Sequence, residues 1–198
     1  MLASSSPRRA QILAELGLPF EVVSAGVDDG DLSPPPTATA ASWTVSMAYL
    51  KARAAIDQLP AGACGVVLGA DTSCELDGQI IGKPADSQEA SRMLHLMSGR
   101  TQRVVTGVAL VNPNNPQDHR LMVTDVAMVT FGPLEGTEID RYVETNGWQG
   151  KAGGYNLAER IADGWAITVE GDPDTVVGLP TQRLTQWLEF AARWEANA

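Results

Sequence analysis

The sequence contains little cysteine and no long apolar run, and both shortages exclude classes of protein. Two cysteines, Cys64 and Cys74, are too few for a disulfide framework or a zinc cluster, so we expect reduced thiols. No apolar stretch reaches the roughly 18 residues that a membrane-spanning helix needs. The first residues also lack the basic and apolar segments of a secretory signal. These absences predict a cytoplasmic protein with no membrane partner.

Positive charge is also scarce, because 14 basic residues stand against 24 acidic ones and the net charge is -10. This excess of negative charge disfavours a general nucleic-acid surface, so no nucleic-acid partner is expected. A local basic pocket for a small anion is still compatible with it. Only three cations are lysines, Lys51, Lys83 and Lys151, and the other 11 are arginines. A lysine kept in such a sequence is a candidate phosphate ligand, since its ammonium is a compact point charge.

Length and composition are typical of a single globular domain. A chain of 198 residues buries about 70% of its unfolded surface, which is enough for a sizeable core. Hydrophobic residues make up 44% and charged residues 19%, so a disordered, fibrous or coiled-coil chain is excluded. No internal repeat divides the chain. We therefore expect one domain over residues 1–198.

Strand and helix patterns alternate along the chain. Apolar or β-branched runs predict strands at residues 20–23, 65–70, 104–111 and 121–131. Helical spacing and capping signals predict helices that end near residue 17 and that span residues 43–58, 86–97, 135–145 and 181–194. The alternation indicates an α/β protein with a mixed sheet.

An Asp-Gly pair at residues 77–78 is a strong signal for a two-residue β-hairpin turn. The hairpin pairs the residues on either side of the turn, and continuing its register sets Thr72 opposite Lys83. Lys83 is therefore expected to return beside Asp71, although strict alternation puts it on the Thr72 face of the strand.

The segment Ser4-Ser5-Ser6-Pro7-Arg8-Arg9 joins a short N-terminal strand to a helical pattern. Ser6 suits the N-cap and Pro7 the first helical position. Two arginines in the first turn oppose the helix dipole, which places about half a positive charge at that end. A bound anion would remove this conflict, because free N–H groups, serine hydroxyls and guanidinium groups all bind phosphate. The alternative is that Arg8 and Arg9 point into solvent.

Asp71 follows a buried apolar run in Leu68-Gly69-Ala70-Asp71-Thr72. The carboxyl end of a buried strand is where α/β proteins usually bind ligands, although a plain turn residue would look the same. His95 and His119 have no partners at ligand spacing, so neither a zinc site nor a Ser-His-Asp triad is expected. The sequence also lacks a Walker loop and a G-x-G-x-x-G motif, which excludes the common NTPase and dinucleotide folds.

A series of short motifs follows one after another over nearly the whole chain. They are Ser4-Ser5-Ser6-Pro7-Arg8-Arg9, Lys51-Ala52, Gly69-Ala70-Asp71-Thr72, Gly82-Lys83-Pro84, Ser98-Gly99-Arg100, Thr106-Gly107-Val108, Gly150-Lys151-Ala152-Gly153-Gly154-Tyr155 and Val176-Val177-Gly178-Leu179-Pro180. Together they resemble the Maf family of nucleoside triphosphate pyrophosphatases. The resemblance implies an elongated mixed β-sheet flanked by helices, two lobes with a central cleft, a relationship to inosine triphosphatases and often a homodimer.

The resemblance also implies a reaction: cleavage of a nucleoside triphosphate between its α and β phosphates, giving a monophosphate and pyrophosphate, with Mg²⁺ or Mn²⁺ as cofactor. The Gly-Ala-Asp-Thr form resembles the branch that acts on dTTP and UTP. Bulk water has a pKa of about 15.7, so a carboxylate base needs a metal that makes the attacking water more acidic. Activity is therefore expected to depend on metal and to rise above neutral pH.

Residue roles follow from the same resemblance, position by position. Asp71 matches the general base and, with Lys51 and Lys83, makes up the predicted catalytic set. Asp71 and Asp29 are the predicted metal ligands. The predicted phosphate binders are Arg8, Arg9, Lys51 and Lys83, and Arg8 and Thr72 match base-selecting positions. The predicted substrate-binding residues are Ser5, Arg8, Arg9, Thr72, Lys151 and Ala158.

Three residues depart from the family's pattern. Gln102 stands where many members have histidine, and Asp29 stands where a metal-binding glutamate is usual. Ala158 replaces a glutamine that is linked to specificity, and an alanine side chain makes no hydrogen bonds. The preferred nucleobase is therefore left open.

Two functions of other classes stay open beside hydrolysis. A nucleotide-binding regulator of cell division that no longer hydrolyses is compatible with Gln102 and Ala158, whereas intact Asp71, Lys51 and Lys83 favour the enzyme. A nucleotidyltransferase also needs a carboxylate, a metal and a lysine near a triphosphate. It would need an acceptor pocket as well, and the sequence shows no distinct one.

Overall fold

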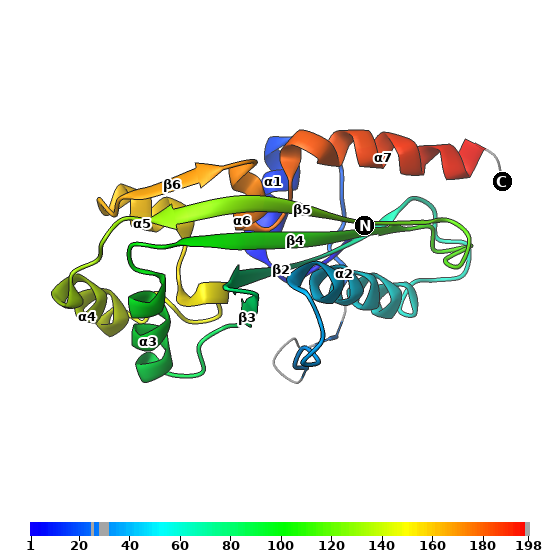
Figure 1. Ribbon diagram of the computed structural model, residues 1–198. Coiled ribbons are helices and arrows are strands. Elements are labelled where there is room, and N and C mark those ends of the chain that lie inside the picture. Colours follow the sequence, from blue (N-terminus) through cyan, green and yellow to red (C-terminus); the bar gives the residue numbers. More distant parts are fainter. Residues whose placement is uncertain (25, 28–31, 197–198) are drawn as a thin grey trace.

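The computed structural model of the chain describes residues 1–24, 26–27 and 32–196 (Figure 1). Its strands are β1 Leu2–Ala3, β2 Val67–Leu76, β3 Gln79–Ile81, β4 Thr101–Val111, β5 Arg120–Phe131 and β6 Ile167–Glu170. Its helices are α1 Pro7–Glu15, α2 Ala40–Ile56, α3 Ser87–Met97, α4 Gly136–Glu144, α5 Leu157–Ala162, α6 Pro173–Val177 and α7 Thr181–Ala196, with a 3-10 turn at Ala152–Gly154.

The six strands form one mixed sheet in the order β1-β2-β4-β5-β6, and β3 pairs with the C-terminal end of β2. β1 and β2 are parallel, and every other pair of strands is antiparallel. β4 and β5 run side by side along the length of the molecule, and the helices flank the sheet they form (Figure 1). The predicted α/β class, with an elongated mixed sheet flanked by helices, is confirmed.

Local capping signals explain where several helices begin. The Asp86 side chain accepts a hydrogen bond from the backbone N–H of Glu89 at the start of α3, as predicted. Ser6 and Pro7 occupy the predicted cap and first positions of α1. The strand predicted at residues 20–23 is wrong in extent, because only Val22 forms an isolated bridge, to Leu2. Among the described residues its strand neighbour is β1, which has two residues and is too short to pair with more of the segment.

Helix α2 packs closely against one face of the sheet because two glycines leave room for it (Figure 1). A Cβ added to Gly69 would lie 2.1 Å from the backbone oxygen of Ala48. A Cβ added to Gly107 would lie 2.4 Å from the backbone carbon of Thr44. These distances are far below van der Waals contact, so any side chain at either position would push the helix away from β2 and β4.

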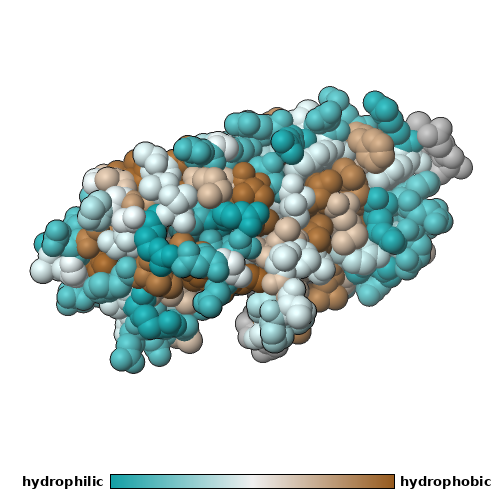
Figure 2. Space-filling model, viewed as in Figure 1, coloured by the Kyte–Doolittle hydropathy of each residue, from teal (hydrophilic) through white to brown (hydrophobic). Residues whose placement is uncertain are grey.

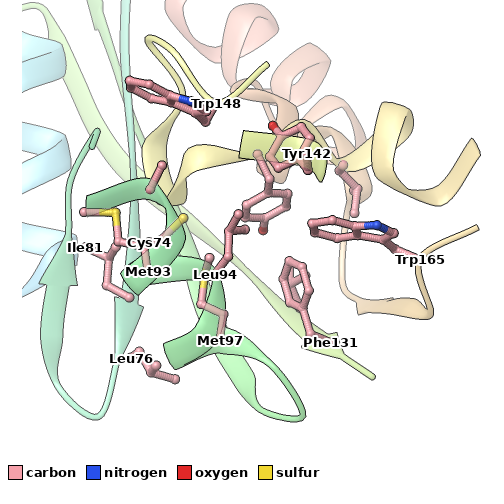
Figure 3. Close-up of a cluster of buried hydrophobic side chains, with 14 of the residues drawn as sticks. Cys74, Leu76, Ile81, Met93, Leu94, Met97, Phe131, Tyr142, Trp148 and Trp165 are labelled. Carbon is pink, nitrogen blue, oxygen red and sulfur yellow. The ribbon is translucent and has the colours of Figure 1, made fainter. Parts of the chain in front are cut away.

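Apolar side chains gather in separate clusters toward the two ends of the sheet. One cluster lies between α3, α4 and residues 148–165, where the Phe131 ring packs edge-on against Tyr155 and Trp165 (Figure 3). The others join α1, α2 and α7 to the opposite end of the sheet, around Leu68 and Leu110 on one face and Val67 on the other. The long strands β4 and β5 connect these ends, and a site between them can draw residues from both.

The surface agrees with the acidic, polar composition. Hydrophilic residues cover much of the face shown in Figure 2, and hydrophobic residues there form small separate patches. Among the helices of the described residues, none is both long and apolar enough to cross a bilayer.

Candidate active site

A gap in the strand pairing of β2 marks the candidate active site. β1 pairs with β2 only at Leu68 and Gly69, and β3 pairs with it only from Cys74 onward. Within the described residues, no strand covers this edge of β2 at residues 70–73. A cleft of about 840 Å³ lies here, lined by the segment after β1, by α1, α2 and β2, and by residues 149–159. The cleft therefore lies between the two ends of the sheet and is lined by residues from both.

Asp71 and Lys51 form a buried ion pair in the wall of the cleft. Nζ of Lys51 donates to Oδ1 of Asp71 over 2.7 Å, and the residues are 6% and 8% exposed. Lys51 lies on the buried side of α2, about one turn after Ala48, which lies over Gly69. Gly69 and Asp71 share one face of β2, because side chains alternate along a strand. The close packing at Gly69 thus brings the lysine within reach of the carboxylate.

Four more of the predicted substrate-binding and catalytic residues line the same cleft. Ser5 and Arg8 come from the segment after β1 and the first turn of α1, Lys83 comes from the segment after β3, and Lys151 precedes the turn at Ala152–Gly154. Cations from four different parts of the sequence therefore converge on one cleft. In a chain with a net charge of -10, this concentration of positive charge is a local feature that suits an anionic ligand.

The hairpin explains only part of the position of Lys83. The residues on either side of the Asp-Gly turn pair as predicted, but β3 ends at Ile81, so the register that sets Thr72 opposite Lys83 is not formed. Beyond that point the backbone oxygen of Gly82 accepts a hydrogen bond from the N–H of Gly153 over 3.0 Å. A hydrogen bond from the turn at Ala152–Gly154 thus holds the segment that carries Lys83.

Arg9 is bonded to protein groups. It is 9% exposed, and its Nε, Nη1 and Nη2 donate to Gly178 O at 3.0 Å, Ser4 Oγ at 3.1 Å and Thr72 Oγ1 at 3.2 Å. These bonds tie together the serine segment, β2 and the end of α6. The alternative interpretation, in which both first-turn arginines point into solvent, is wrong for Arg9. At least three of the five N–H donors of its guanidinium serve the protein itself, and its contact with phosphate stays a prediction.

A chain of hydroxyl groups continues from Thr72 into the core. Thr72 Oγ1 lies 2.8 Å from Thr106 Oγ1, which donates to the backbone oxygen of Thr175 over 2.6 Å. Thr175 Oγ1 in turn donates to Oδ2 of Asp125 over 2.6 Å. Sequence reasoning missed this chain. Its members lie on β2, β4, α6 and β5, so no local pattern could have connected them.

The wall formed by residues 149–159 contains the departures from the family's pattern near Tyr155. Lys151 Nζ and Glu159 Oε2 form an ion pair of 3.0 Å, and Asn156 Nδ2 donates to Glu159 Oε1 over 3.1 Å. Ala158 is exposed on α5, and the described lining of the cleft includes its two neighbours but not Ala158 itself. Sequence reasoning gave Glu159 no role, although a charged side chain directly after Ala158 was a signal for it.

Cys74 and Tyr155 line the cleft with neutral groups. Burial raises the pKa of the Cys74 thiol to about 12. Burial, together with the neighbouring Cys74, raises the pKa of the Tyr155 hydroxyl well above its usual range. Gln102 Nε2 donates to Tyr155 Oη over 2.8 Å, while no partner within the described residues reaches its buried Oε1. Both Cys74 and Tyr155 therefore stay protonated at neutral pH and add no charge to the cleft.

Of the two predicted metal ligands, Asp71 lies in the cleft and Asp29 lies outside the described residues. Among the side chains that the structure describes, no group of three or more His, Cys, Asp or Glu residues is placed to hold a metal. Mg²⁺ usually binds one or two carboxylates and completes its shell with water and substrate phosphates. The residues therefore fit a cation that a nucleotide helps to hold, with Asp71 as one ligand.

Comparison with known proteins agrees with the resemblance that the motifs predict. A family model for Maf-like proteins matches residues 1–191. A dTTP/UTP pyrophosphatase of Symbiobacterium thermophilum is 40% identical, over 95% of this chain and 91% of that protein. Proteins of the same name from Aromatoleum aromaticum and Pelotomaculum thermopropionicum are 38% identical (95% of this chain, 93% of the relative) and 39% identical (96% and 94%). The chain belongs to the Maf-like protein family.

Proposed function

We propose that this protein is a nucleoside triphosphate pyrophosphatase, which hydrolyses the bond between the α and β phosphates and releases a monophosphate and pyrophosphate. The single observation that carries the proposal is the buried pair of Lys51 and Asp71 in the wall of a cleft that Arg8 and Lys83 also line. A carboxylate beside several cations is the combination that water activation and triphosphate binding need. The relatives named dTTP/UTP pyrophosphatase support the same reaction.

The cations of the cleft bind the triphosphate and stabilise the leaving group. Pyrophosphate gains negative charge as the α–β bridging bond breaks, and fixed positive charges near that bond lower the barrier. Arg8 offers a planar group with several donors, whereas Lys51 and Lys83 offer point charges that fit single phosphate oxygens. Because the rest of the chain is acidic, the bound anion has few competing sites on the protein.

Asp71 acts as the general base. Its Oδ1 accepts the hydrogen bond from Lys51, which leaves Oδ2 for a water molecule that enters the cleft. The water oxygen adds to the α-phosphorus, the bridging P–O bond breaks toward the β-phosphate, and the water proton passes to the carboxylate. Lys51 holds the carboxylate in one orientation during this step.

A divalent cation, Mg²⁺ or Mn²⁺, is the proposed cofactor. Asp71 and the substrate phosphates would hold it, and it would supply positive charge to the phosphates and make the attacking water more acidic. Activity is then expected to require added metal, to disappear with a chelator and to rise above neutral pH.

The proposed substrates are dTTP and UTP, after the relatives' names and the Gly69-Ala70-Asp71-Thr72 segment. Ala158 stands where the base-linked glutamine would be expected, and its neighbour Glu159 forms an ion pair with Lys151 in the wall of the cleft. A panel of nucleotides therefore has to include both keto and amino bases as well as modified ones.

The test measures pyrophosphate and monophosphate release from this panel with Mg²⁺ or Mn²⁺. Wild-type protein is compared with Asp71→Asn and with the matched control Asp77→Asn, which changes a carboxylate to an amide in the exposed hairpin. We expect both products from wild type and the control, and a loss of about 10²- to 10⁴-fold in Asp71→Asn. Nucleotide binding without turnover on the whole panel would contradict the enzyme and support the regulator. Transfer of the nucleotide to an added acceptor would support the transferase.

A further inference from the structure

The hydroxyl chain on the inner side of the cleft has a fixed direction, and this direction decides what Thr72 offers to a ligand. Thr106 Oγ1 lies 2.6 Å from the backbone oxygen of Thr175. A carbonyl oxygen only accepts, so the single hydroxyl proton of Thr106 must point toward it. The 2.8 Å contact between Thr72 and Thr106 then needs a proton from Thr72. The hydroxyl proton of Thr72 is thus committed to Thr106.

The other end of the chain agrees with this direction. Nη2 of Arg9 lies 3.2 Å from Thr72 Oγ1, and a guanidinium group only donates. Thr72 therefore accepts from Arg9 and donates to Thr106. A hydroxyl oxygen has two lone pairs, so one acceptor position is left and no donor. Thr72 lines the cleft and is half-buried, which makes this lone pair its remaining means of contact with a ligand there.

We propose that Thr106 is a positioning residue for selectivity: with Thr175 O and Arg9 it locks Thr72 as a pure hydrogen-bond acceptor, which meets an N–H or O–H donor of the nucleoside. This proposal rests on the proposed function, because it takes a nucleoside triphosphate as the ligand. Ionised phosphate oxygens only accept hydrogen bonds. The donors of such a ligand lie on its base and its sugar, so the phosphates do not bind at Thr72.

Burial makes the lock effective. Thr106 is fully buried, and Thr175 is fully buried as well, so water does not compete for the bond between them. A ligand acceptor placed against Thr72 would face a lone pair and leave a desolvated group unpaired, and a site of this kind rejects the wrong partner strongly. Selectivity would then originate in a residue that does not line the described cleft.

Two sources of the donor are tested separately. The base arm compares α,β-methylene analogues of UTP and CTP, because uracil carries an N3–H where cytosine carries a lone pair. The sugar arm compares the UTP analogue with its 2′-fluoro and 3′-fluoro forms, which each replace a hydroxyl donor by a weak acceptor. Binding of these non-hydrolysable analogues is measured by calorimetry with wild type, Thr106→Val and Thr106→Ser.

In wild type we expect one arm to show a ratio of dissociation constants of about 10- to 100-fold in favour of the donor. Thr106→Val has nearly the same shape but no hydroxyl, so Thr72 can turn its proton toward the ligand. The ratio in that arm is expected to fall below about threefold. Thr106→Ser restores the hydroxyl and is expected to restore the wild-type ratio, which a merely structural role would not require.

Three results would overturn the proposal. These are ratios near one in every arm for wild type, a ratio that Thr106→Val leaves unchanged, and a Thr106→Ser protein that behaves like Thr106→Val. Thermal unfolding of each variant shows whether it is folded, and Thr106→Ala, which also lacks the hydroxyl, takes the place of Thr106→Val if that variant is not folded. The analogues are not hydrolysed, so their binding is measured independently of turnover. A protein that selects among analogues but releases no pyrophosphate would therefore contradict the proposed function and leave this inference standing.

Discussion

Two adjacent residues of β2, Asp71 and Thr72, serve the same cleft from opposite faces of one strand. On the Asp71 face, a charged pair is buried beneath α2 and held at 2.7 Å. On the Thr72 face, neutral hydroxyls form a chain toward α6 and the guanidinium of Arg9 closes its outer end. The two residues are adjacent in sequence but have different surroundings, because successive side chains of a strand point to opposite faces of the sheet.

One strand thus supplies both reactivity and recognition, because its two faces hold different groups. A buried ion pair is costly unless both partners are present, so the Asp71 face depends on the exact approach of α2. A hydroxyl chain adds no charge, but its hydrogen bonds have a direction that neighbouring groups impose. We therefore expect changes on the first face to alter turnover and stability most. Changes on the second face should alter the choice of ligand.

The largest effect is expected when the charged pair is broken from the lysine side. Lys51→Met leaves the Asp71 carboxylate buried without its partner, so unfolding free energy should fall by about 3 to 5 kcal/mol. Turnover should fall by at least about 100-fold, because the base and a phosphate ligand are both disturbed. Denaturant unfolding and steady-state kinetics measure the two effects.

The double variant Lys51→Met with Asp71→Asn is the control for this prediction. It removes both charges and is expected to be more stable than Lys51→Met alone. Equal stability of the single and double variants would show that the pair is not coupled and would break the contrast between the two faces.

A smaller effect is expected when α2 is displaced without a change of charge. Gly69→Ala and Gly107→Ala each place a Cβ against the backbone of α2, and either should cost about 1 to 3 kcal/mol. Both should also lower turnover, because Lys51 moves with the helix. Gly136→Ala on α4 is the matched control, since its nearest neighbour would be 4.0 Å from the added Cβ.

Unfolding curves measure the stability of the three variants, and kcat values measure their turnover. Turnover at the wild-type level in a folded Gly69→Ala protein would mean that the approach of α2 does not position the lysine.

The smallest effect at neutral pH is expected from Cys74, two residues beyond Thr72 on the same face. The pKa of its thiol rises from 9.0 to about 12 in the folded chain, because burial disfavours the thiolate. Its stabilising contribution is therefore complete below pH 9 and is lost as the pH rises toward 12. Above pH 9 the free energy of unfolding falls by about 1.4 kcal/mol per pH unit because of this thiol, since the unfolded chain releases the thiol proton first.

Unfolding by urea at pH 8, 9 and 10 measures this slope. Cys74→Ala should flatten it, whereas Cys64→Ala, at an exposed position, should leave it as in wild type. The same slope in both variants would show that the thiol of Cys74 does not titrate late.

The parts of the fold that could be predicted depend on neighbours in sequence. The Asp-Gly hairpin and the Asp86 cap of α3 involve residues at most a few positions apart, and both are confirmed. The strand at residues 20–23 was overestimated, because its extent depends on the two-residue β1 and not on its own composition. Local chemistry was enough for the turn and the cap.

The candidate site was predicted in its residue types more than in its contacts. The motifs predicted one site for Asp71, Lys51, Lys83 and Arg8, and all four residues line one cleft. The contact between Lys51 and Asp71 depends on glycines that let a helix approach a sheet, which is a property of the tertiary packing. Hydrogen bonds among residues on four separate elements carry no sequence signal at all, so the hydroxyl chain could come only from the structure.

The most direct test of the account is turnover of UTP and dTTP in ¹⁸O-labelled water, with wild type and Asp71→Asn compared under the same metal conditions. We predict that wild type places the label in the nucleoside monophosphate and releases unlabelled pyrophosphate, and that Asp71→Asn nearly abolishes both products. Label in pyrophosphate, release of inorganic phosphate with a diphosphate, or full turnover by Asp71→Asn would contradict it.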